Sequence, residues 1–171
     1  MRVVGVDPGL SRCGVGVVDG PPQRPTAVRA GVIRTAPEEP LARRLARLHA
    51  ELTDVLRESH ADVVAVERVF FNANVRTAMA VGQAAGIVLL CAEQAGLEVV
   101  EYTPTQVKAT VTGSGSAAKE QVGFLVRAHL RLASAPAQPD ATDALALALC
   151  HLQRARDPRA SHPGLASGVG R

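Results

Sequence analysis

Cysteine is scarce in this sequence. The three cysteines, Cys13, Cys91 and Cys150, lie far apart within apolar segments and form no Cys-X-X-Cys motif. An odd number of cysteines with this spacing argues against a disulfide framework and predicts reduced thiols in the core. The five histidines make no metal-ligand spacing with the cysteines, which argues against a zinc site.

Long apolar runs are also missing. The most apolar stretch, residues 87–92, is too short to cross a bilayer. The first seven residues reach a charge before any long apolar segment, so we expect no signal peptide. Together with the reduced cysteines, these features predict a cytoplasmic protein.

What the sequence does contain indicates one ordered domain. Apolar residues make up 47% of the 171 residues, and this length suits a single domain with a core of its own. A net charge of +3 is compatible with a polyanionic partner but identifies none. Residues 156–171 are rich in Pro, Gly, Ser and Ala without periodicity, so we expect a domain over residues 1–155 and a disordered tail over residues 156–171.

The hydrophobic pattern predicts the element order β-β-β-α-β-α-β-α-α-α. The expected strands cover residues 3–6, 13–18, 27–34, 62–67 and 97–102. The expected helices cover residues 41–56, 75–95, a short stretch from 104 to about 113, 117–132 and 140–154. Three consecutive strands followed by strands joined through helices predict an α/β fold with a mixed five-stranded sheet and helices on its faces.

Carboxylates stand at the ends of these elements. Asp7 ends the first strand, Glu67 ends the fourth, and Asp140 and Asp143 share one face at the start of the last helix. If the first and fourth strands run parallel side by side, Asp7 and Glu67 meet at the carboxyl edge, where α/β sheets commonly build sites. Four acids there would repel one another, and an oxygen-only ligand set favours Mg²⁺ or Mn²⁺.

Each acid also has an ordinary structural explanation. Asp7-Pro8-Gly9 is a typical turn, and Glu67 beside Arg68 fits a surface ion pair. Asp140 and Asp143 suit the start of a helix by capping and by the helix dipole. No single acid is specific, and it is the combined spacing that favours a metal site.

Several motifs in a fixed order resemble the RuvC family of Holliday junction resolvases. They are VVGVDPGLSRCGVGVV at 3–18, AVERVFF at 65–71, VGQAAG at 81–86, YTPTQVKATVTGSGSAAKEQV at 102–122 and PDATDALALALCH at 139–151. The resemblance implies a ribonuclease-H-like fold and a homodimer that nicks two opposed strands of a four-way DNA junction in recombination and repair. It also implies two Mg²⁺ ions per subunit, with Mn²⁺ as a substitute, and the RuvA–RuvB branch-migration complex as a partner.

The resemblance also implies roles for individual residues. The catalytic and metal-binding acids fall on Asp7, Glu67, Asp140 and Asp143. The DNA-binding residues fall on Phe70, Lys108, Lys119 and Arg76. Phe70 is the expected stacking residue for an unpaired base, and in a continued strand its neighbour Phe71 would point inward.

The small residues Ala78, Gly82 and Gly86 form a stripe at four-residue spacing. From the residues alone, this stripe suits either a tight helix contact between two subunits or packing of the helix on its own sheet. The resemblance favours the dimer.

Three other functions remain open. An ATP-using protein of the actin and sugar-kinase superfamily shares the strand, Asp and Gly of the first motif, but needs two such domains, and 171 residues hold one. A related small nuclease acting on RNA shares the first Asp-X-Gly pattern. A non-catalytic nucleic-acid-binding module is disfavoured because four acids would weaken phosphate binding.

Overall fold

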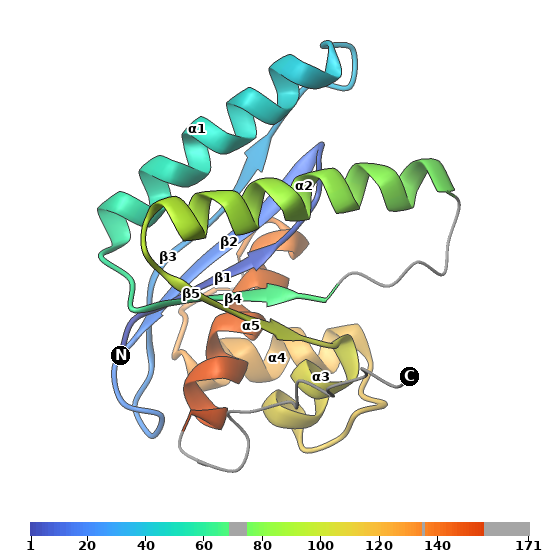
Figure 1. Ribbon diagram of the computed structural model, residues 1–171. Helices are drawn as coiled ribbons and strands as arrows, with labels where there is room; N and C mark the ends of the chain where they lie inside the picture. The colour runs from blue at the N-terminus through green and yellow to red at the C-terminus, as the bar shows by residue number, and fades with distance from the viewer. Residues whose placement is uncertain (69–74, 135, 156–171) are drawn as a thin grey trace, which may run out of the picture.

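A mixed five-stranded sheet forms the centre of the protein (Figure 1). The computed structural model describes residues 1–68, 75–134 and 136–155, apart from the side chains of 75–77. In spatial order the strands are β3 (Thr26–Arg34), β2 (Arg12–Asp19), β1 (Val3–Asp7), β4 (Val63–Glu67) and β5 (Glu98–Tyr102). Pairing is antiparallel from β3 to β1 and parallel from β1 to β5, which confirms the predicted mixed sheet.

The two central strands are almost entirely apolar because helices cover both of their faces. In β1, Val4 and Val6 belong to the core under one helical layer, and Val3 belongs to the core under the other. Such continuous valine runs are typical of parallel strands buried on both faces. Only the last residue of each strand, Asp7 in β1 and Glu67 in β4, is charged.

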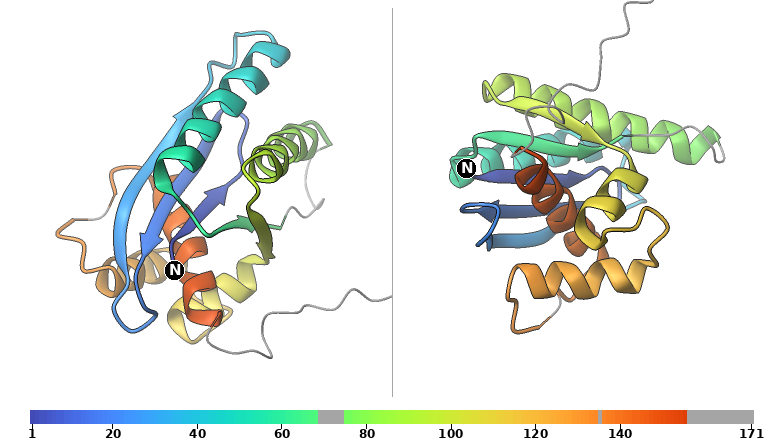
Figure 2. Two further views of the ribbon diagram at one scale, coloured as in Figure 1. Left: turned by 60° about the vertical axis from the view of Figure 1, so that its left-hand side comes forward. Right: turned by 90° about the horizontal axis from the view of Figure 1, so that it is seen from below.

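One face of the sheet carries α1 (Leu41–Ser59) and α2 (Val75–Gln94) (Figure 2). The leucines of α1 recur at the predicted spacing, and Leu48 and Leu52 are fully buried against the sheet. The first helix ends where His60 adopts a left-handed backbone conformation. No helix in the described part of the chain is long and apolar enough to span a membrane.

The other face carries α3 (Pro104–Thr112), α4 (Lys119–His129) and α5 (Pro139–Arg154) (Figure 2). The third helix begins at a capping box in which Thr103 and Gln106 satisfy each other's backbone N–H groups. The fourth helix is shorter than the predicted range 117–132. Ala118 occupies its N-cap position without a side-chain hydrogen bond, and Arg131, with a φ of 53°, takes a left-handed conformation just after its end.

The fifth helix lies directly on β1 and β2 because three glycines face it. A Cβ atom at Gly16 would stand 2.6 Å from the backbone N of Leu145, and one at Gly5 would stand 2.7 Å from that of Ala148. A Cβ atom at Gly14 would likewise press on the backbone of Asp140. The backbone of α5 therefore approaches the sheet more closely than side chains at these positions would allow.

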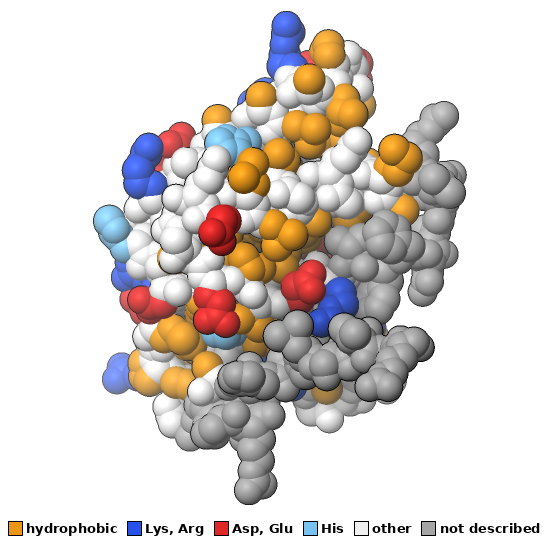
Figure 3. Space-filling model, in the orientation of Figure 1, with side chains coloured by type: hydrophobic (Ala, Val, Ile, Leu, Met, Phe, Trp, Pro, Cys, Tyr) orange, Lys and Arg blue, Asp and Glu red, His pale blue; other side chains and the backbone are white. Residues whose placement is uncertain are grey.

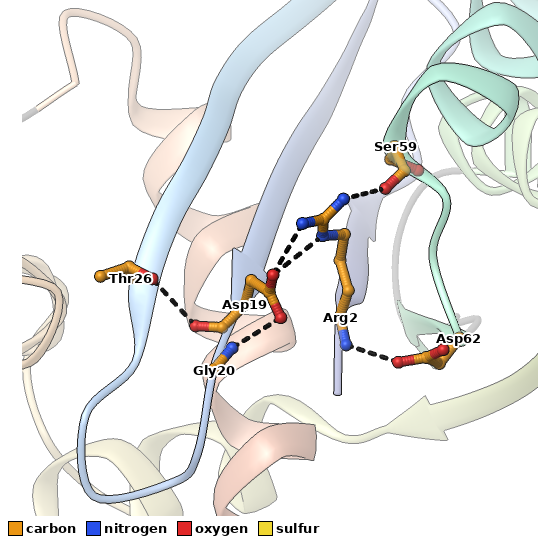
Figure 4. A network of polar contacts seen from close by, with 6 residues as sticks. All are labelled: Arg2, Asp19, Gly20, Thr26, Ser59 and Asp62. Carbon is orange, nitrogen blue, oxygen red and sulfur yellow. Dashed lines mark hydrogen bonds and ion pairs between the residues drawn. The ribbon is translucent and has the colours of Figure 1, made fainter.

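A polar network joins the elements at the amino-terminal ends of β1 and β4, the edge of the sheet opposite Asp7 and Glu67 (Figure 4). The Arg2 guanidinium donates to Asp19 Oδ2 from Nε (3.1 Å) and Nη2 (2.7 Å), and to the carbonyl of Ser59 from Nη1. The backbone N–H of Arg2 donates to Asp62 at 2.7 Å. These bonds join β1, β2 and the end of α1, and they lie at the opposite edge of the sheet from the acids.

Candidate active site

Asp7 and Glu67 come together because β1 and β4 are parallel neighbours in register. Val6 lies opposite Val66, so the residue that follows each valine ends its strand at the same edge. Both carboxylates are half-buried. The structure thus confirms that these two strands run side by side, as the sequence-based interpretation required.

The two acids of α5 reach the same edge across β2. Gly14 is the partner of Asp7 in the β1–β2 ladder. A Cβ atom at Gly14 would stand 2.7 Å from the carbonyl carbon of Asp140 and 3.2 Å from its Cβ. The absent side chain lets the first turn of α5 lie against β2, which places Asp140 and Asp143 beside the end of β1.

The acids interact electrostatically. Burial raises the pKa of Asp7 to about 7, and the negative charges of Glu67, Asp143 and Asp140 add to this increase, while Lys119 opposes it. Burial also raises the pKa of Glu67, with Asp143 as the next contributor and Lys119 again opposed. Carboxylates that share a site destabilise one another in their charged forms, and a bound cation relieves that repulsion.

Two basic side chains already pair with the acids of α5. Arg12 donates from Nε to Asp140 Oδ2 at 2.7 Å, and Lys119 donates from Nζ to Asp143 Oδ2 at 2.6 Å. Within the described ranges, no three His, Cys, Asp or Glu side chains are grouped tightly enough to hold a metal ion as they stand. The carboxylate donor set nevertheless fits Mg²⁺ or Mn²⁺, which prefer oxygen ligands.

A hollow of about 210 Å³ opens beside the acids. It brings together four residues that the sequence singled out, namely Glu67, Asp143, Lys108 and Lys119. The rest of its lining is apolar: Pro104, Val107, Val122, Ala146 and Leu147. Lysines and carboxylates around one hollow suit a phosphate held next to a cation.

The structure does not test every residue that the sequence predicted. Phe70 and Phe71 lie outside the described residues. Arg76 lies on α2, but its side chain is also outside the described part. The predicted tail, residues 156–171, is likewise not described.

Sequence reasoning missed Arg12, which contacts a predicted catalytic acid. It also missed the glycines of β1 and β2 that admit α5. The available signal was the alternation of glycine in GVGV (residues 14–17), because glycines two apart in a strand share one face.

The strand order, the helices on both faces and the acidic carboxyl edge define this protein as a ribonuclease-H-like α/β domain. Comparison with known proteins gives the family. Residues 3–151 match the family described as crossover junction endodeoxyribonuclease RuvC. A protein of that name from Salinispora arenicola is 52% identical over 155 residues, covering 90% of this chain and 89% of its own length. The chain belongs to the RuvC family of crossover junction endodeoxyribonucleases.

Solved structures agree with this assignment. T. thermophilus RuvC in complex with a Holliday junction substrate superposes with a TM-score of 0.88 at 41% identity, covering 91% of this chain and 95% of its own. The yeast mitochondrial Holliday junction resolvase, at 12% identity and a TM-score of 0.62, shares the fold; that match covers 88% of this chain and 78% of its own. The family and the fold favour a DNA junction nuclease over the RNA-cutting and ATP-using alternatives.

Proposed function

We propose that this protein resolves four-way DNA junctions by paired nicks in opposed strands, during recombination and repair. The observation that carries the proposal is the meeting of four carboxylates from β1, β4 and α5 at one sheet edge, in a chain that belongs to the RuvC family. The T. thermophilus relative is named for its complex with a Holliday junction. We also place the protein in the cytoplasm and take the RuvA–RuvB complex as its partner.

The metal is part of the proposal. Asp7, Glu67, Asp140 and Asp143 would hold two Mg²⁺ ions per subunit, with Mn²⁺ as a substitute. Bound metal supplies a water nucleophile, neutralises the phosphoryl oxygens and assists the leaving 3′ oxygen. Asp7 would be the central ligand, because β1 lies between β4, which ends in Glu67, and β2, which carries the first turn of α5. Burial first, and then the charges of the other three acids, raise the pKa of Asp7 to about 7.

The two lysines beside the acids would contact the DNA substrate. Lys119 is exposed and already in contact with Asp143, and Lys108 lines the same hollow. An ammonium group there neutralises a phosphate oxygen and holds the strand against the acids. Both lysines are therefore proposed to bind the strand that is cut.

The function is tested by incubating the protein with a labelled four-way junction, a linear duplex, a structured RNA and ATP, each with and without Mg²⁺. We expect paired nicks in the junction only, and only with Mg²⁺. Cleavage of the RNA in preference to the junction would contradict the proposal, and so would ATP hydrolysis without any nicking.

We further propose that the protein acts as a homodimer through α2. A Cβ atom at Gly82 or Gly86 would meet no atom within 4 Å, so these glycines do not pack on the sheet of their own subunit. Met79, Leu89 and Leu90 lie on the same side of α2 and are exposed. Apolar side chains are spread over the α1 and α2 side of the molecule (Figure 3). An exposed apolar helix face of this kind is typical of a subunit interface.

Gly82→Leu is expected to convert the dimer to monomers. A leucine at this position fills the space into which a second helix would pack, and its Cβ atom meets no atom of its own subunit within 4 Å. Sedimentation velocity at micromolar concentration measures the change, and the monomers should lose paired nicking. Ala46→Leu, at an exposed position of α1, is the control and should remain dimeric. A wild-type protein that is monomeric at this concentration would refute the interface.

Phe70→Ala is expected to keep the fold and the dimer but to lose cleavage of a fully paired junction. Opening a base pair costs a few kcal/mol, and stacking one freed base on an aromatic ring returns about 1–3 kcal/mol. Cleavage should return on a junction with unpaired bases at the crossover, where the opening cost is already met. The measurement is the single-turnover nicking rate on the two junctions.

Phe71→Ala is the matched control for this substitution. If Phe71 is fully buried, its expected effect is a loss of about 3–5 kcal/mol in the free energy of unfolding. If the effects of F70A and F71A are exchanged, the roles of the two rings are reversed. If neither substitution changes cleavage, the stacking hypothesis is wrong.

A further inference from the structure

Two arginines face each other across neighbouring strands next to the acids. Arg12 in β2 is the register partner of Arg34 in β3. Directly opposed residues of an antiparallel pair project from the same face of the sheet with their Cβ atoms about 5 Å apart, and like charges there are unfavourable. The pair lies at the same edge as Asp7, since β2 starts there and β3 ends there. An anion bound beside such a pair relieves the repulsion.

The backbone on both sides of this pair is held rigidly. Thr35 follows Arg34 and is buried, and its N–H donates to the carbonyl of Ser11, which precedes Arg12. Arg44 of α1 donates to the hydroxyl oxygens of both Thr35 (2.9 Å) and Ser11 (2.5 Å). The backbone next to the two facing arginines is thus held in place before any ligand arrives, which lowers the entropic cost of binding.

Only one of the two facing arginines is neutralised by a carboxylate among the described residues. Arg12 is paired with Asp140, so that pair is neutral. Arg34 is exposed, and none of the ion pairs between described residues includes it. By contrast, Arg29 on the same strand has a carboxylate partner, Glu58, at 3.0 Å. Arg34, next to the Arg12–Asp140 pair, therefore has no carboxylate partner among the described residues and can take an anionic ligand.

We propose that Arg12 and Arg34 bind a backbone phosphate of the DNA strand being cut, next to the phosphate held by the acids. The inference rests on the proposed function. Lys108 and Lys119 line the hollow that reaches Glu67 of β4, whereas the arginine pair lies on β2 and β3, on the other side of Asp7 in the sheet. The DNA strand is therefore held on both sides of the acids, by lysines on one side and by arginines on the other.

The test is the salt dependence of junction binding, measured by fluorescence anisotropy in metal-free buffer with a chelator. Each phosphate neutralised contributes about −0.9 to the slope of log K against log salt. We expect R34A to weaken binding and flatten the slope, and R34K to restore most of it. The double variant R12A/R34A should flatten the slope by about one unit in total, because both arginines hold the same phosphate.

Two matched variants separate the possible outcomes. R29A removes an arginine from the same strand that already has a carboxylate partner, and it should leave the slope unchanged. K108A should flatten the slope independently of R34A, with additive effects. An unchanged slope for R34A, with normal wild-type binding and cleavage, would overturn this inference alone. A wild-type protein that neither binds nor cuts the junction would overturn the proposed function.

Discussion

Asp7→Asn is expected to abolish junction cleavage and to leave junction binding intact or tighter. Asparagine has nearly the same shape as aspartate but carries no charge, so we expect the fold to be preserved while the proposed central metal ligand is weakened. The cleavage rate should fall by more than about a thousandfold, which corresponds to about 4 kcal/mol of transition-state stabilisation. Binding should improve because one negative charge beside the phosphate is removed.

Single-turnover cleavage with Mg²⁺ and anisotropy binding with Ca²⁺ measure the two effects separately. Asp54→Asn is the control, because Asp54 is exposed on α1 and pairs only with its helix neighbour Arg57 among the described residues. It should change neither quantity. If D7N nicks the junction at nearly the wild-type rate, the assignment of the metal site is wrong.

Gly16→Ala is expected to lower the free energy of unfolding by about 3 kcal/mol or more, at the upper end of the cost of overpacking a core. The added methyl group would stand 2.6 Å from the backbone N of Leu145 and 2.9 Å from its Cα. A helix backbone has no flexible end that moves aside, so the whole of α5 must shift. Urea denaturation monitored by circular dichroism measures the loss.

Gly31→Ala is the matched control, since Gly31 lies in the neighbouring strand β3 and a Cβ atom there meets nothing within 4 Å. Its expected effect on the free energy of unfolding is within about 1 kcal/mol of zero. Because α5 carries Asp140 and Asp143, G16A should also reduce cleavage at temperatures where it is still folded. Equal stability of G16A and the wild type would show that α5 does not press on the sheet.

The sequence alone determined the order of the elements and the ends of most of them. The valine runs that stop at Asp7 and Glu67 indicate buried strands. The spacing of the leucines in α1 indicates one buried helix face, because the buried side of an element follows its local periodicity. The linked motifs around Asp7, Glu67, Lys108, Lys119 and Asp143 identified the family. The short connections between the first three strands suggested an antiparallel start, and the helical connections suggested a mixed sheet. The sequence left open whether the first and fourth strands are parallel neighbours, and the structure shows that they are.

Only the tertiary structure decided which residues meet across elements. The sequence left open whether Gly82 and Gly86 pack on their own sheet, and the structure shows that they do not. The structure also shows that Gly14 lets the backbone of the first turn of α5 lie close to β2. It shows further that Arg12 donates a hydrogen bond to Asp140, and that Arg34 is the register partner of Arg12. Periodicity specifies the buried face of each element separately. Contacts between elements depend on strand register and on how closely two backbones approach, and residues far apart in the chain set both.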